Sequence, residues 1–194
     1  MSDITDAPAP ADGDTVQGKA GAGAPPIVIL AQYTKDLSFE NPKAPASLAA
    51  AAKAPPQVEI NVDVQARDMQ NDVYEVVLRI VATARPTPVE GQPAPAADEV
   101  AFLLDLSYAG LFRLEGVKEE LRKPVLLIEA PRLLFPFARE IMANTSRQGG
   151  FPPLLINPVD FTDLYRRQAG QTQNEQANVE ADPTAALNED KPLV

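Results

Sequence analysis

The sequence predicts an α+β fold, in which a four-stranded antiparallel sheet is followed by a long helix and a shorter one. Four segments in succession show the alternation of a strand, and no helical pattern separates them. After Gly110 the spacing of apolar residues changes to that of a helix. Strands that come first and helices that come later are typical of the α+β class.

The first strand is expected at residues 27–40, where IVILA leads into QYTKDLSFE. Successive side chains of a strand point to opposite faces, so Tyr33, Leu37 and Phe39 are expected on one face. The polar residues are expected on the other face: Gln32, Thr34, Asp36, Ser38 and Glu40. Asn41-Pro42 should end the strand.

Residues 57–64, 73–84 and 99–108 carry the other three strand signals. Valine and isoleucine alternate strictly with polar residues in 57–64, whereas the two later strands carry apolar residues on both faces. Examples on the more polar face are Val77, Val81 and Leu103. This excess predicts that the chain oligomerises or presents apolar surface to another polypeptide, and the two can coexist.

A long helix is expected over 131–147, where apolar residues recur at helical spacing. It should start near 131–133, keep Pro136 in its first turns and stop at Gly149-Gly150. For the shorter helix, Asn157 is the expected N-cap, before Pro158 at the first helical position, with Asp160 in the first turn.

Two connections also have distinctive compositions. The alanine run within 41–56 allows a helical turn or two, although prolines bracket it. Residues 85–98 hold four prolines and a glycine, which predicts a mobile hairpin loop.

The ends of the chain predict three parts: a disordered acidic tail at 1–26, a folded domain at 27–170 and a second disordered acidic tail at 171–194. The tails have few large apolar side chains and cannot offset the entropy of ordering. They also hold most of the net charge of −10, with four Asp and one Lys in the first tail and five acids and one Lys in the second.

Composition excludes several functions. An acidic chain without a basic stripe is a poor ligand for nucleic acid or an anionic membrane. The chain has no His and no Cys, which excludes imidazole bases, thiolate nucleophiles and metal sites built on those ligands. No secretory signal or membrane-spanning stretch is present, so a cytoplasmic location is expected.

Asp36 and Glu40 raise the question of a carboxylate pair. Four residues of strand span about 13 Å at about 3.3 Å each, whereas carboxylates acting across one glycosidic bond lie about 5–10 Å apart. Catalysis is therefore disfavoured, and no catalytic residue is predicted. Together with Asp105, the pair can form a solvated face or a docking surface, and the outward Leu103 favours docking.

Five stretches, taken in order, closely resemble the SecB family of bacterial protein-export chaperones. They are YTKDLSFENPKAP (33–45), NDVYEVVLR (71–79), EVAFLLDLSYAGLF (99–112), LFPFARE (134–140) and GGFPPLLINPVDFTDLY (149–165). The resemblance implies a sheet followed by a long and a shorter helix, which agrees with the fold predicted from periodicity.

The resemblance also implies a function: a cytoplasmic holdase that keeps precursor proteins unfolded and delivers them to the SecA translocation ATPase. It implies a homotetramer that is a dimer of dimers, with no enzymatic activity and no cofactor. The main alternative is a non-catalytic oligomeric adaptor that binds a basic partner through its acidic sheet face.

Carried over by position, the resemblance assigns SecA docking to Asp36, Glu40, Leu103 and Asp105. Asp105 is one methylene shorter than the Glu more usual in the family. A client-binding groove would be lined by apolar residues, each of which could instead belong to the core: Phe39, Val58, Ile60, Val62 and Phe102.

Overall fold

The structure is a computed structural model that describes residues 27–88, 94–96 and 98–168. The two predicted tails, 1–26 and 171–194, lie outside the described residues, as does part of the predicted loop 85–98. All described residues lie within the predicted folded domain 27–170, of which residues 89–93, 97 and 169–170 are not described.

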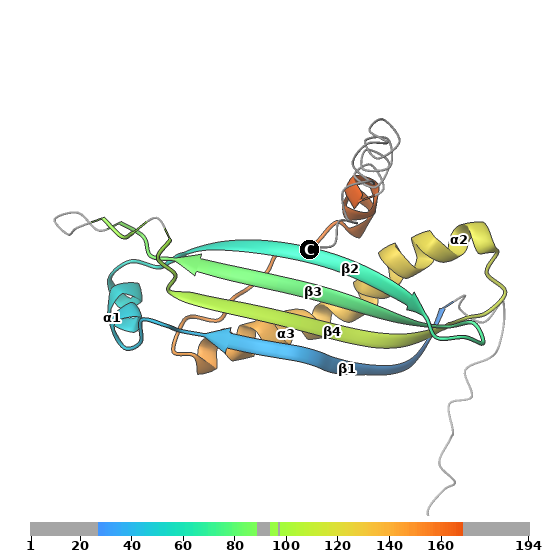
Figure 1. The fold of residues 1–194 in the computed structure, drawn as a ribbon, viewed down its shortest axis with the longest axis horizontal. Helices are drawn as coiled ribbons and strands as arrows, with labels where there is room; N and C mark the ends of the chain where they lie inside the picture. Colours follow the sequence, from blue (N-terminus) through green and yellow to red (C-terminus); the bar gives the residue numbers. More distant parts are fainter. Residues whose placement is uncertain (1–26, 89–93, 97, 169–194) are drawn as a thin grey trace, which may run out of the picture.

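A four-stranded antiparallel sheet forms the body of the fold, as predicted (Figure 1). Its strands are β1 (Ile27–Glu40), β2 (Gln57–Asp68), β3 (Val73–Arg85) and β4 (Phe102–Leu114). The order across the sheet is β1-β4-β3-β2, so β1 and β2 are the edges. β4 starts later than predicted, and it also ends later, because Leu111, Phe112 and Leu114 continue to pair with β1 or β3.

The pairing of β1 with β4 corrects one prediction. The register shifts between Thr34 and Asp36, which leaves Lys35 as an extra residue. Such a bulge reverses the alternation of faces. Tyr33 therefore lies on the face opposite Leu37 and Phe39. Gln32 and Thr34, predicted on the face of Asp36, lie instead on the face of Leu37, in the rows of Gly110 and Tyr108. Asp36 and Glu40 keep the predicted outward orientation.

A long helix covers one face of the sheet, and shorter helices lie near its ends (Figure 1). After β1, α1 (Ala46–Lys53) forms from the alanine run. After β4 the chain is helical from α2 (Glu119–Pro124) through a π-helical turn, η1 (Val125–Glu129), into α3 (Ala130–Gln148). In Figure 1, α3 runs behind the sheet and α2 lies beyond one end of it.

The predicted start of the long helix near 131–133 was therefore too late. Proline supplies no N–H and usually interrupts a helix, but the unpredicted helical segment 119–130 contains Pro124 and is followed directly by Pro131. The π turn lies between these prolines, where Ala130 N–H donates to the Val125 carbonyl five residues earlier. This change of hydrogen-bond spacing lets the chain remain helical through both prolines.

α3 packs on β4, β3 and β1, and this layer contains the core. Leu78, Ile80, Leu104 and Leu106 of the sheet are fully buried against the helix layer, which contributes Leu134 and Met142 among others. We call the sheet face under α3 the covered face and the opposite face the uncovered face.

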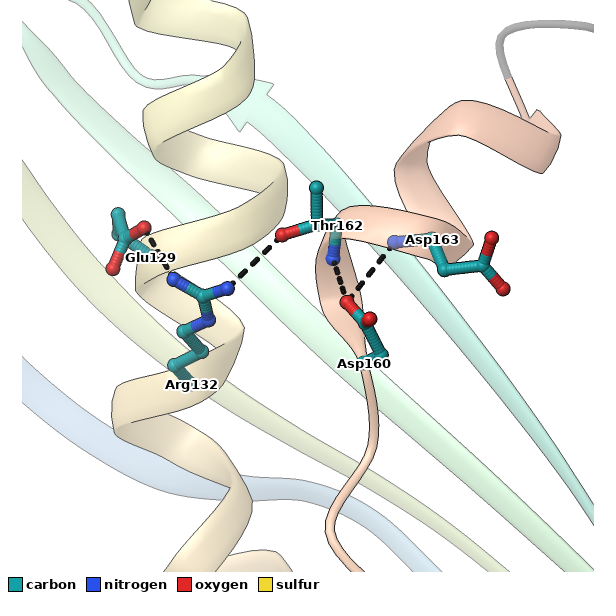
Figure 2. A network of polar contacts seen from close by, with 5 residues as sticks. All are labelled: Glu129, Arg132, Asp160, Thr162 and Asp163. Atoms are coloured by element: carbon teal, nitrogen blue, oxygen red, sulfur yellow. Dashed lines mark hydrogen bonds and ion pairs between the residues drawn. The ribbon is translucent and has the colours of Figure 1, made fainter.

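Residues 161–168 form the shorter helix, which starts three residues later than predicted. Asp160, not Asn157, caps it: Asp160 Oδ1 accepts hydrogen bonds from the backbone N–H groups of Thr162 and Asp163 at 2.9 and 3.1 Å (Figure 2). Those two bonds lower the pKa of Asp160. The first helical residue, Phe161, packs edge-on against Phe135 of α3, which fixes the start of the helix.

Candidate functional site

The four predicted docking residues share the uncovered face on two neighbouring strands. Glu40 of β1 lies directly opposite Leu103 of β4, and Ser38 lies opposite Asp105 in the next row. Asp36 follows in a third row, opposite Ser107. The structure therefore brings all four residues into one continuous patch, which we call the docking surface.

Asp36 and Glu40 are exposed, and neither forms an ion pair with any described residue. Leu103 is half-buried beside Glu40. Two uncompensated carboxylates next to an apolar side chain can bind a basic group with an apolar portion. The spacing that disfavours a catalytic pair is kept, because both acids lie on the same strand.

Asp105 differs from these two acids because it has a partner within the sheet. Arg79 Nη2 donates to Asp105 Oδ2 at 2.6 Å, and Arg79 Nε donates to Asp105 Oδ1 at 3.1 Å. This is the two-point geometry in which arginine binds carboxylates most strongly. The bonds to Asp105 raise the pKa of Arg79, and the charges of Asp63 and Asp36 add to this effect.

A second polar cluster on the same face surrounds Glu75 of β3. Tyr33 Oη donates to Glu75 Oε1 at 2.5 Å, and Lys35 Nζ lies 2.8 Å from both carboxylate oxygens. The bonds from Lys35 and Tyr33 lower the pKa of Glu75, and the bond to Glu75 raises the pKa of Tyr33 to about 12. Both donors come from the bulged part of β1, so the cluster anchors the bulge that precedes Asp36.

The five predicted groove residues occupy different surroundings. Val58 and Ile60 of edge strand β2 are each 36% exposed, and Val62 is half-buried. Phe102 is only 2% exposed and packs with Phe39 and Phe151 in an aromatic cluster, with ring centroids 4.7–6.4 Å apart.

Gly149 closes this aromatic cluster. A β-carbon on Gly149 would overlap the ring of Phe39, so glycine is required there for packing, although its backbone conformation is ordinary. Phe102 is a core residue, whereas Val58 and Ile60 present apolar surface.

Sequence reasoning missed Arg79, Glu75 and Lys35 as contributors to this face. Arg79 and Glu75 alternate with valines on the more polar side of β3, so their orientation was available from the pattern. Their partners were not, because Asp105 and Tyr33 belong to strands whose order in the sheet the pattern does not specify.

Within the described ranges, the structure contains no helix long and apolar enough to cross a membrane. The same residues include no group of three or more potential metal ligands. The features that stand out are a patterned polar face, an apolar edge and a helix-covered core, and this combination favours a protein that acts by binding other polypeptides.

Comparison with known proteins identifies the family. The family model described as "Preprotein translocase subunit SecB" matches residues 20–172. The protein-export protein SecB of Maricaulis maris is 47% identical over 188 residues, which cover 94% of this chain and 99% of that protein. The SecB of Afipia carboxidovorans is 49% identical over 170 residues, which cover 85% and 99%. The chain belongs to the SecB family of protein-export chaperones, as the resemblance predicted.

A solved structure confirms the fold. The SecB-like chaperone of Mycobacterium tuberculosis, in complex with a peptide from the HigA1 antitoxin, matches with a TM-score of 0.52 at 14% identity. The match covers 69% of this chain and 90% of the other.

Proposed function

We propose that the protein is a cytoplasmic holdase, which keeps precursor proteins unfolded and delivers them to the SecA ATPase for export. The observation that carries the SecA part is the row arrangement of the docking surface, in which Glu40 faces Leu103 and Ser38 faces Asp105. A basic partner segment can contact the acids and the leucine together, because they form one patch on two paired strands.

Client binding is proposed along the apolar edge of the sheet that β2 forms. Val58, Ile60 and Val62 alternate along this strand on the covered face, and two of them are substantially exposed. An edge strand also has unpaired backbone groups, which an extended polypeptide can pair with whatever its sequence. Phe39 and Phe102 would lie at the end of this groove, with Phe102 reached only after the aromatic cluster opens.

A homotetramer built as a dimer of dimers is supported by the other edge. β1 is a 14-residue edge strand with exposed apolar side chains, among them Ile29, Leu30 and Leu37. On α3, Leu133 and Phe137 lie one turn apart and are 38% and 48% exposed. Surfaces of this kind are normally covered by another subunit.

The test combines assembly, client binding and docking on the full-length chain. Light scattering should give four chain masses, and the tetramer should suppress aggregation of an unfolded precursor but bind the folded form weakly. Reversing Asp36 and Asp105 to lysine should reduce the affinity for purified SecA more than about tenfold, because attraction becomes repulsion. Suppression of aggregation should stay unchanged.

Glu115→Lys is the matched control, because Glu115 is an exposed acid that follows β4 and lies outside the docking surface. It should leave SecA affinity within about twofold of the parent. A protein that binds SecA but does not delay aggregation would instead be an adaptor. A monomer that does neither would overturn the proposal.

A further inference from the structure

Arg79 lies on the uncovered face among carboxylates that come from the other three strands. On β3 it lies opposite Asp63 of β2 on one side and opposite Ser107 of β4 on the other, with Asp36 of β1 next in the same row. Asp105 lies diagonally across from Arg79, in the neighbouring row. The guanidinium is therefore placed among three carboxylates on three strands.

Of these carboxylates, Asp105 is the one that Arg79 binds, through both of its oxygens. The Arg79 side chain is 54% exposed, whereas that of Asp105 is 20% exposed. The cation therefore lies toward solvent over a carboxylate that it partly shields. A basic group that approaches from solvent meets Arg79 before it can use both oxygens of Asp105.

Asp63 is a second carboxylate that the guanidinium of Arg79 can reach. Its carboxylate accepts hydrogen bonds from two neutral amides, at 3.1 Å from Gln65 and 2.9 Å from Gln168, and forms no ion pair with a described residue. Because Asp63 lies directly across the strand pair from Arg79, a change of side-chain rotamer suffices to exchange one carboxylate for the other.

We infer that Arg79 is an intramolecular counter-ion that masks Asp105. A basic partner binds Asp105 by displacing Arg79, whose guanidinium then moves to Asp63. This inference rests on the proposed docking function and adds a residue that tunes its affinity. Arg79 lowers the affinity of the uncovered face for cations in general. The full acidic surface becomes available only to a partner that also engages Asp36, Glu40 and Leu103.

The experiment measures binding of purified SecA to the full-length protein at fixed ionic strength. Arg79→Gln should tighten binding about two- to fivefold, since an ion pair of this exposure is worth that much in affinity. Arg79→Lys, which keeps the charge, should stay near the parent value. Arg67→Gln is the matched control, because Arg67 is exposed on the same face, opposite Glu75, and loses the same charge.

A double-mutant cycle separates masking from a general charge effect. In an Asp105→Asn background, Arg79→Gln should no longer tighten binding, because no carboxylate is left to uncover. Asp63→Asn should weaken SecA binding in the parent protein, because the displaced Arg79 then has no second carboxylate to bind. It should not weaken SecA binding in the Arg79→Gln variant, which has no guanidinium to displace. Thermal unfolding of each variant checks that the fold is retained.

Three results would contradict the inference. In the first, the parent binds SecA but Arg79→Gln does not bind it more tightly. In the second, Arg79→Gln still tightens SecA binding in the Asp105→Asn background. In the third, Arg67→Gln tightens SecA binding as much as Arg79→Gln does. If the parent does not bind SecA at all, the proposed docking function fails and the inference fails with it. This result is distinguishable from the other three, because in each of those the parent binds SecA.

Discussion

The two faces of the sheet have opposite chemistry although the same four strands supply both. The covered face buries Leu78, Ile80, Leu104 and Leu106 completely under α3. The uncovered face carries carboxylates and basic side chains, most of which remain accessible to solvent. Because strand residues alternate between the faces, stability and recognition are encoded in alternate positions of the same segments.

The uncovered face also has one feature of a core. Glu75 is buried; its charge is paired with Lys35, and it accepts a hydrogen bond from Tyr33. The division between a stabilising face and a binding face is therefore incomplete at the bulge of β1, where a polar cluster holds an edge strand in register. The following predictions test the division from the largest expected effect to the smallest.

The largest effect is expected from a comparison of two leucines of β4, one on each face of the sheet. Leu106→Ala should lower the free energy of unfolding by about 2–5 kcal/mol, because it leaves a cavity at a fully buried site. Leu103→Ala, its counterpart on the uncovered face, should cost less than about 1 kcal/mol but weaken SecA binding. Urea unfolding and SecA titration measure the two effects, and equal losses of stability would refute the division.

Much of this division could be predicted from the sequence alone. Alternation in β2, β3 and β4 assigned their faces correctly, and the outward orientation of Asp36 and Glu40 was also correct. These features are local, because they depend only on the two-residue period of a strand. The face of Tyr33 was wrong because the bulge at Lys35 depends on pairing with β4 and on bonds to Glu75, 40 residues away in the chain.

The missed parts share this dependence on distant partners. No pattern in 119–131 indicates that two prolines will be accommodated by a π turn, because that turn is stabilised by packing on the sheet. In the same way, Arg79 could be placed on a face, but its bond to Asp105 required the order of β3 and β4. Local periodicity predicts orientation, and only the assembled sheet predicts partners.

Glu75→Gln tests the core-like cluster on the uncovered face. The substitution removes the ion pair with Lys35 and should cost about 1–2 kcal/mol, a modest value because Lys35 is 39% exposed and can return to water. Since the folded pKa of Glu75 lies below its ordinary value of 4.5, its contribution is present above that pH and is lost in more acidic solution. Urea unfolding at pH 7 and at pH 3 should therefore show a deficit that shrinks in acid.

The same variant should change the titration of Tyr33. The pKa of Tyr33 is about 12 against an ordinary 10.0, so its contribution is complete below pH 10 and is lost as the pH rises toward 12. In Glu75→Gln the pKa should fall toward 10.0, which absorbance at 295 nm detects. Tyr33→Phe is the control, because it should remove the titration step near pH 12. If that step survives in Tyr33→Phe, it belongs to another tyrosine.

The smallest effect is expected where helix 161–168 joins the helix layer of the covered face. Asp160→Ala removes the acceptor for two backbone N–H groups, whereas Asp160→Asn keeps an acceptor and removes only the charge. Amide hydrogen exchange at Thr162 and Asp163 should therefore speed up strongly in the alanine variant and weakly in the asparagine variant. Exchange in the sheet should not change, because Arg132 and Phe135 still contact the helix through Thr162 and Phe161. Faster exchange in β3 or β4 would show that the cap supports the covered face as a whole.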